Sequence, residues 1–176
     1  MSQSKIKTEF KLTREILNQR ITKAVELFKE GYNCSQSVVA AFSDLYGYTD
    51  KQAFHMAASF GGGIGRMRQT CGSACGMFLL AGLDCGSTEA SDREGKSHNY
   101  QVVQNMADEF KNINGTLICA ELLGLKEISQ DYNAEARTTA YYKKRPCAKM
   151  VEISASIFAN YLARKYNIEE ISLPID

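Results

Sequence analysis

The chain has 176 residues, of which 44% are hydrophobic and 23% are charged, with two prolines and no tryptophan. A chain of this length buries roughly 70% of its unfolded surface, so the composition predicts one globular domain over residues 1–176 and excludes a disordered or fibrous protein. The 21 basic and 20 acidic residues leave a formal net charge of +1, which gives no electrostatic basis for binding nucleic acid or an anionic membrane.

Apolar residues recur at steps of three and four along most of the chain, which is the period of an amphipathic α-helix. No segment alternates like a half-buried strand, and we find no internal repeat and no low-complexity linker. The sequence therefore predicts an all-α fold, a compact bundle of about six to seven helices behind a polar N-terminal segment, 1–11. In chain order, the predicted helical segments are 12–30, 33–47, 49–60, 71–83, 88–112, 116–124, 133–142 and 146–166, of which 116–124 is short and 133–142 is only a turn or two.

Residues that cap helices mark several of these boundaries. Gly31 ends the first segment. Asn33 precedes the second, and Gln36 follows it at the spacing of a capping box. Pro146 suits the first position of the last helix, where its missing N–H has no helical partner in any case. Between the third and fourth segments, the glycines of 61–65 predict a turn with an open backbone.

Six cysteines are the unusual feature of the composition. They are too sparse for a disulfide-stapled scaffold, and the N-terminal residues lack the apolar core of a secretory signal. The longest apolar run, 77–83, is too short to cross a bilayer. We therefore expect a cytoplasmic protein without membrane insertion, whose cysteines are free, metal-bound or redox-active. Because the chain has two histidines and no C-x-x-C, H-E-x-x-H or Walker A motif, any chemistry is expected to use sulfur.

Four of the cysteines fall in the first turn of a predicted helix. These helix-start cysteines are Cys34, Cys71, Cys119 and Cys147. The first turn has unpaired backbone N–H groups and the positive end of the helix dipole, which stabilise a thiolate, lower its pKa and can donate to a coordinated sulfur. The gaps of 37, 48 and 28 positions match no local zinc or ferredoxin motif. Two interpretations stay open: one shared sulfur site formed by the tertiary fold, or scattered thiols that act as small core residues.

Basic residues and glycines lie near these cysteines in the sequence. Arg66 and Arg68 precede the second helix-start cysteine, and three basic residues, 143–145, precede the fourth. Their charges can offset an anionic thiolate site. The turn at 61–65 is expected to let backbone approach a cofactor closely. The positions expected to contact a cofactor are Gly62, Gly63 and Gly72.

Four separated runs carry a family resemblance: GYNCSQSVVAAF, FGGGIGRMRQTCGSACG, NGTLICAELLG and RPCAKMVEISASI. Over about 24–165, the chain resembles the C_GCAxxG_C_C family of redox-active proteins. The resemblance implies a small helical protein whose defining cysteines do redox work or hold an iron–sulfur or other metal centre. It also implies a likeness to modules of split-Soret-type cytochromes, with which an iron–sulfur site is associated. The family's four cysteines map onto the helix-start cysteines.

The chain departs from the family's C-G-A-x-x-G motif. Ser73 replaces the alanine, and Cys75 adds a thiol four residues after Cys71, on the same face of a helix. Cys75 can replace one metal ligand, act as a resolving thiol or pack in the core. The pattern assigns no role to Cys85, which lies at or past a helix end.

Three functions remain open from the sequence. The first is electron transfer or redox sensing by a [2Fe–2S] or [4Fe–4S] cluster on the helix-start cysteines. The second is a thiol–disulfide oxidoreductase with Cys71 as the attacking thiol. Its resolving partner is then Cys34, Cys75 or Cys119. The third is a structural zinc protein, which ranks last because a chain this long has enough core without a metal. We also expect an unidentified redox partner. The apolar face of 88–112 is expected to pack either in the core of the monomer or against a second copy of the chain in a homo-oligomer.

Overall fold

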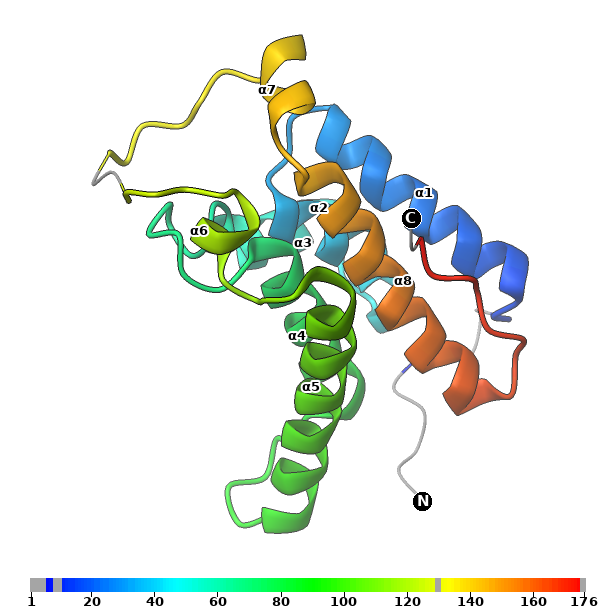
Figure 1. The fold of residues 1–176 in the computed structure, drawn as a ribbon. Coiled ribbons are helices and arrows are strands. Elements are labelled where there is room, and N and C mark those ends of the chain that lie inside the picture. The colour runs from blue at the N-terminus through cyan, green and yellow to red at the C-terminus, as the bar shows by residue number, and fades with distance from the viewer. Residues whose placement is uncertain (1–5, 8–10, 129–130, 175–176) are drawn as a thin grey trace.

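The computed structural model describes residues 6–7, 11–128 and 131–174 (Figure 1). These residues form eight α-helices, two short 3₁₀ helices and no strand apart from a single β-bridge. The all-α prediction is confirmed, and the helix count exceeds six to seven because two of the α-helices span only four and six residues. Most of the predicted N-terminal segment, 1–11, lies outside the described residues. The elements are α1 (Arg14–Lys29), α2 (Cys34–Ala40), η1 (Ser43–Tyr46), α3 (Asp50–Ala57), η2 (Ala58–Phe60), α4 (Gly72–Cys85), α5 (Arg93–Asn114), α6 (Cys119–Leu122), α7 (Thr139–Lys144) and α8 (Cys147–Tyr166).

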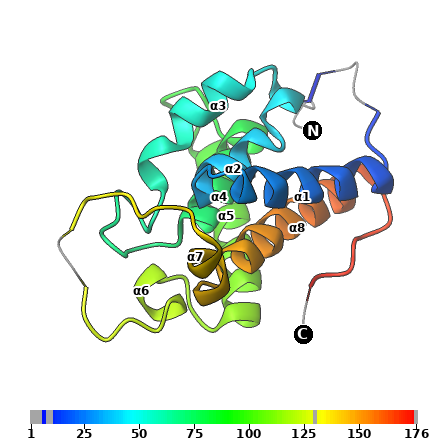
Figure 2. The same ribbon diagram turned by 90° about the horizontal axis from the view of Figure 1, so that it is seen from above.

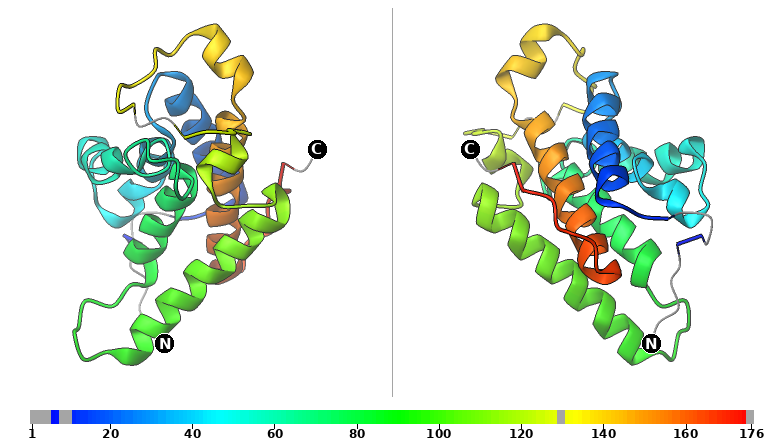
Figure 3. Two further views of the ribbon diagram at one scale, coloured as in Figure 1. Left: turned by 60° about the vertical axis from the view of Figure 1, so that its left-hand side comes forward. Right: turned by 90° about the vertical axis from the view of Figure 1, so that its right-hand side faces the viewer.

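Helix α2 packs against most of the other long helices (Figure 2). Helices α1 and α8 run side by side and contact α2 (Figure 3). Helix α4 packs against both α2 and α8, and α5 packs against α4 and α8. Small residues bring α2 and α4 close together: a Cβ added at Gly76 would lie 2.9 Å from the carbonyl oxygen of Ser35. The N-terminal ends of α2 and α4 are therefore held in a fixed relation.

The core is one continuous cluster of buried apolar side chains. Phe42 and Phe158 meet edge to face, with ring centroids 5.1 Å apart, and both are fully buried. Leu17, Leu80 and Phe110 are also fully buried. Burial of a side chain of this size stabilises the fold by roughly 1.5–3 kcal/mol, so the periodic apolar residues account for the packing of the bundle. None of the described helices is long and apolar enough to span a lipid bilayer.

Several predicted helices have different ends in the structure. The segment predicted as 88–112 is helical over Arg93–Asn114, that predicted as 116–124 over Cys119–Leu122, and that predicted as 49–60 divides into α3 and η2. The segment predicted as 33–47 divides into α2 and η1, because the backbone leaves the helical conformation at Phe42 (φ −130°, ψ −15°). The segment predicted as 133–142 is helical only from α7 onward. The hydroxyl of Thr138 caps that helix by accepting a hydrogen bond from the Tyr141 backbone N–H at 3.2 Å, and the residues just before Thr138 are not helical.

A buried carboxylate joins α4 to α8 at the end of the bundle away from the start of α4. Asp84 is fully buried and accepts hydrogen bonds from the hydroxyls of Tyr46 (3.1 Å) and Tyr161 (2.5 Å). The ammonium of Lys165 also donates to it, at 2.6 Å. Burial, together with the charge of Asp84, raises the pKa of both tyrosines, so their hydroxyls keep the protons that the carboxylate needs.

Replacing Asp84 with alanine should lower the free energy of unfolding by about 3 kcal/mol, because it leaves the Lys165 ammonium and two hydroxyls without their acceptor. Urea unfolding at pH 7 measures the change. Asp108→Ala is the matched control, because Asp108 pairs with Lys111 on the exposed side of α5, where an ion pair contributes less than about 1 kcal/mol. Equal losses in the two variants would show that the buried network adds no stability.

Candidate functional site

Four cysteines from four helices line one cavity of about 50 Å³. They are the helix-start cysteines Cys34, Cys71, Cys119 and Cys147, at the N-terminal ends of α2, α4, α6 and α8. Residues of α6 and α8 line the same cavity, although the two helices are separated by a long stretch of chain. The tertiary fold therefore brings together thiols that no local motif connects. We refer to this space as the cysteine cavity.

Local hydrogen bonds fix the start of α2. The side-chain oxygen of Asn33 accepts from the backbone N–H groups of Ser35 and Gln36, both at 3.0 Å. The side-chain oxygen of Gln36 accepts in return from the Asn33 N–H at 3.0 Å, so the capping box expected from the sequence is present. The Asn33 amide also donates to the carbonyl of Ala58 at 2.9 Å, which ties this cap to η2. Cys34 is thus held as the first residue of the helix.

A short backbone pairing holds Cys71 and Cys119 near each other. The Cys71 N–H donates to the carbonyl of Leu117 at 2.7 Å, and the Cys119 N–H donates to the carbonyl of Gln69 at 2.6 Å. These bonds surround an isolated antiparallel β-bridge between Thr70 and Ile118. Sequence reasoning missed this bridge, because a pairing of single residues leaves no alternating pattern. Cys71 itself is the cap residue of α4, whose first helical residue is the next one.

The glycines before and within α4 give the cysteines room. Two of the three glycines predicted to contact a cofactor, Gly62 and Gly72, line the cysteine cavity, and Gly63 does not. A Cβ added at Gly63 would lie 2.6 Å from the Cβ of Cys119, and one added at Gly72 would lie 2.9 Å from the Sγ of Cys34. The backbone at these two positions therefore approaches the cysteines themselves. Gly63 also has a φ of +73°, which few other residues adopt without strain.

Cys147 starts α8, directly after Pro146. The proline is the cap residue of this helix, one position earlier than the sequence predicts. Its ring and that of Tyr141 line the cysteine cavity with Cys147. The apolar remainder of the wall comes from Leu122, Leu123 and Met150. These side chains limit the access of water to the thiols.

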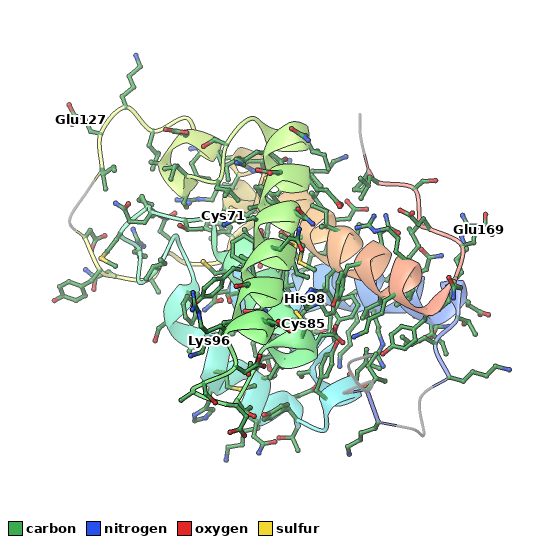
Figure 4. All side chains as sticks on the ribbon, turned by 90° about the horizontal axis from the view of Figure 1, so that it is seen from below. Cys71, Cys85, Lys96, His98, Glu127 and Glu169 are labelled. Atoms are coloured by element: carbon green, nitrogen blue, oxygen red, sulfur yellow. The ribbon has the colours of Figure 1, made fainter. Side chains whose placement is uncertain are left out.

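The other two cysteines differ in their distance from the cavity. Cys75 is buried one turn further along α4 and does not line it, although its pKa is raised to about 11 by burial and by the charge of Cys34. Cys85 is the last residue of the same helix, about 20 Å along it at 1.5 Å per residue (Figure 4). Its sulfur lies 3.2 Å from the carbonyl of Ala81 and 3.3 Å from the amide nitrogen of Asn99. Cys85 therefore lies at the opposite end of α4 from the cysteine cavity.

Burial controls the protonation of the cavity thiols. It raises the pKa of Cys71 and of Cys147 to about 12, and it raises the pKa of Cys119 as well. The charge of Cys34 raises each of these three pKa values further, which places Cys34 near all of them. The lowered pKa values expected at helix starts are therefore wrong for these three thiols, because loss of hydration outweighs the helix N-terminus. At neutral pH they keep their protons unless a cation replaces them.

Three arginines share the cavity wall with the thiols: Arg68, Arg137 and Arg145. Arg68 is buried, and its side chain and charge oppose the rise of the Cys119 pKa. The Arg137 guanidinium lies between the rings of Phe28 and Tyr141, 4.7 Å and 4.6 Å from their centroids. Sequence reasoning noted Arg68 and Arg145 from their neighbours but missed Arg137, because no cysteine lies near it in the chain.

Cysteine thiolates are ligands for both a single zinc ion and an iron–sulfur cluster. Among residues 6–7, 11–128 and 131–174, no three or more His, Cys, Asp or Glu side chains form a ready site for one metal ion. A zinc ion needs four sulfur atoms about 3.5–4 Å apart, because its bonds to sulfur are ~2.3 Å long. An iron–sulfur cluster separates its cysteines by the width of its inorganic core. Four thiols around one cavity, with guanidinium groups in the same wall to balance their charge, are the type of donor set that an iron–sulfur cluster uses.

Comparison with known proteins identifies one family. A family model described as "Putative redox-active protein (C_GCAxxG_C_C)" matches residues 32–161. This range contains the four helix-start cysteines and every residue that lines the cysteine cavity. Comparisons with curated proteins and with solved structures gave no match.

Proposed function

The chain belongs to the C_GCAxxG_C_C family, and on that premise we propose that it is a redox protein that holds an iron–sulfur cluster for electron transfer or redox sensing. The ligands in this proposal are the four helix-start cysteines. The observation that carries it is their convergence, from four separate helices, on one cavity that also contains arginines. The proposal includes a redox partner and a cytoplasmic setting, in which the thiols stay reduced.

The residues of the cavity have separate tasks in this proposal. The four sulfurs bind the cluster, which supplies a one-electron couple when present. The Arg68 side chain lowers the pKa of Cys119, and the charges of Arg145 and Arg137 lower that of Cys147. Hydrogen bonds and positive charge next to ligating sulfurs stabilise the reduced, more negative state. The apolar part of the wall excludes water, which protects such a centre from hydrolysis and oxidation.

Thiol–disulfide exchange is the second candidate, and the thiols of α4 support it less well. It requires a reactive thiolate, yet the pKa values of Cys71 and Cys75 are raised to about 12 and about 11. All six cysteines are free in this structure. A structural zinc ion ranks third, because the thiols form no ready site for a single ion among the described residues.

Protein purified without oxygen should be brown and should contain iron and acid-labile sulfide in equal amounts, about two or four of each per chain. Elemental analysis and a sulfide assay on the same sample measure both. One zinc per chain in colourless protein would support the structural alternative and contradict the cluster. Metal-free protein with a reversible disulfide, seen by mass spectrometry, would support thiol–disulfide exchange instead.

A further inference from the structure

Three arginines converge on one carboxylate next to the cysteine cavity. The guanidinium of Arg145 lies 2.5 Å from Oε1 of Glu135, that of Arg66 lies 3.4 Å from it, and that of Arg68 lies 3.6 Å from it. Glu135 comes from the segment that precedes α7, and its side chain is 41% exposed. The Arg68 side chain is only 9% exposed, so it forms part of a built site and not of the open surface.

This carboxylate lies in a second pocket, which we call the side pocket. It has a volume of about 290 Å³ and is more open to solvent than the cysteine cavity. The two spaces share a wall made of Asn33, Gly62, Arg68, Arg137, Tyr141 and Arg145. A molecule in the side pocket would therefore be separated from the four sulfurs only by side chains that line both spaces.

The arginines have more hydrogen-bonding capacity than Glu135 uses. Nη1 of Arg137 and Nε of Arg66 are buried and have no hydrogen-bond partner among the described residues. A buried donor without a partner costs about 1–3 kcal/mol. Four guanidinium groups that face one pocket, some of them with unused donors, form the type of site that binds carboxylates and oxyanions.

We propose that the side pocket binds a small oxyanion, either a carboxylate or a tetrahedral oxyanion, on Arg66, Arg68, Arg137 and Arg145. Glu135 occupies the anion position in the free protein and is displaced by the ligand. The inference rests on the proposed function and extends it, because it names the chemical class of small molecule that is bound beside the redox centre. Bound there, the ligand's charge is balanced by the arginines, three of which also line the cysteine cavity.

Glu135→Gln tests this inference, because it removes the carboxylate charge that Arg66, Arg68 and Arg145 share, keeps the shape of the side chain and leaves the pair between Arg66 and Asp131 in place. Sulfate and acetate are titrated separately into the full chain by calorimetry, with the ionic strength held constant by chloride. Glu135→Gln should bind at least one of the two about tenfold more tightly than the natural chain. Arg145→Gln, added to that variant, should reverse the gain. The matched control is Glu169→Gln. Glu169 lies on the C-terminal segment, where its exposed carboxylate pairs with Arg14 of α1 (Figure 4).

Each outcome of this titration is decisive. Binding of acetate alone assigns a planar carboxylate, and binding of sulfate alone assigns a tetrahedral oxyanion. The inference is overturned if neither the natural chain nor Glu135→Gln gives saturable binding, or if Glu135→Gln and Glu169→Gln bind alike. Iron and sulfide are assayed on the same preparations. Anion binding by cluster-free protein would support this inference while contradicting the proposed function, and a cluster without anion binding would do the reverse.

Discussion

Cys34→Ser should remove at least about nine-tenths of the iron and labile sulfide from protein prepared without oxygen, because a neutral hydroxyl is a poor replacement for a thiolate ligand. Cys34 lines the cysteine cavity with the other three helix-start cysteines, and its charge raises the pKa of each of them. The measurement is the iron and sulfide content per chain, together with the visible absorption spectrum.

Two serine variants within α4 serve as controls for this experiment. Cys85→Ser should keep the full iron and sulfide content, because Cys85 lies at the far end of the helix (Figure 4). Cys75→Ser should keep it as well, because Cys75 does not line the cysteine cavity. If Cys34→Ser and Cys85→Ser retain equal amounts of iron, the cluster is not on the helix-start cysteines. If Cys75→Ser loses its iron, this additional thiol is a ligand in place of one of the four.

Gly72→Ala should lower the free energy of unfolding by about 2–4 kcal/mol. The added Cβ would lie 2.6 Å from the backbone carbonyl oxygen of Phe60 and 2.9 Å from the Sγ of Cys34. Backbone cannot move aside as the end of a flexible side chain can, so either the start of α4 or η2 must shift. The shift also displaces Cys34, and the iron content should fall with the stability. Urea unfolding and iron analysis measure the two effects.

Gly82→Ala is the matched control, because Gly82 lies in the same helix and a Cβ added there meets nothing within 4 Å. Alanine in an open position within a helix is more stable than glycine by about 0.5–1 kcal/mol, so this variant should unfold at a higher urea concentration than the natural chain. The two substitutions are chemically identical and should change stability in opposite directions. Destabilisation of both by similar amounts would show that the close approach at Gly72 is unimportant.

The sequence predicts those parts of the fold that depend on local chemistry. The apolar period predicts the long helices, and the capping residues around Asn33 predict the start of α2 with its hydrogen bonds. The placement of cysteines at helix starts follows from the same local signals. The breaks within predicted helices are harder to foresee, since η1 arises from the backbone conformation of one residue, Phe42, which carries no distinctive sequence signal.

The parts of the site that depend on tertiary contact could not be derived in this way. The bridge between Thr70 and Ile118 joins single residues from distant segments, so it leaves no pattern in the chain. Glu135 lies in a segment predicted as helix, and its contacts with Arg66 and Arg145 come from the path of that segment across the cavity. The raised pKa values of the thiols depend on burial. The apolar period of a sequence predicts which face of a helix is buried, but it does not predict whether the first residue of that helix is buried.

The wide separation of the four sulfurs along the chain has a consequence for biosynthesis. During translation, Cys34, Cys71 and Cys119 leave the ribosome well before Cys147, which begins the last helix. In the proposed function, the full set of cluster ligands therefore exists only after Cys147 has been made and α8 has packed against the other helices. Because binding to the folded state alone stabilises that state, a bound cluster would add its stabilisation only after these helices have assembled.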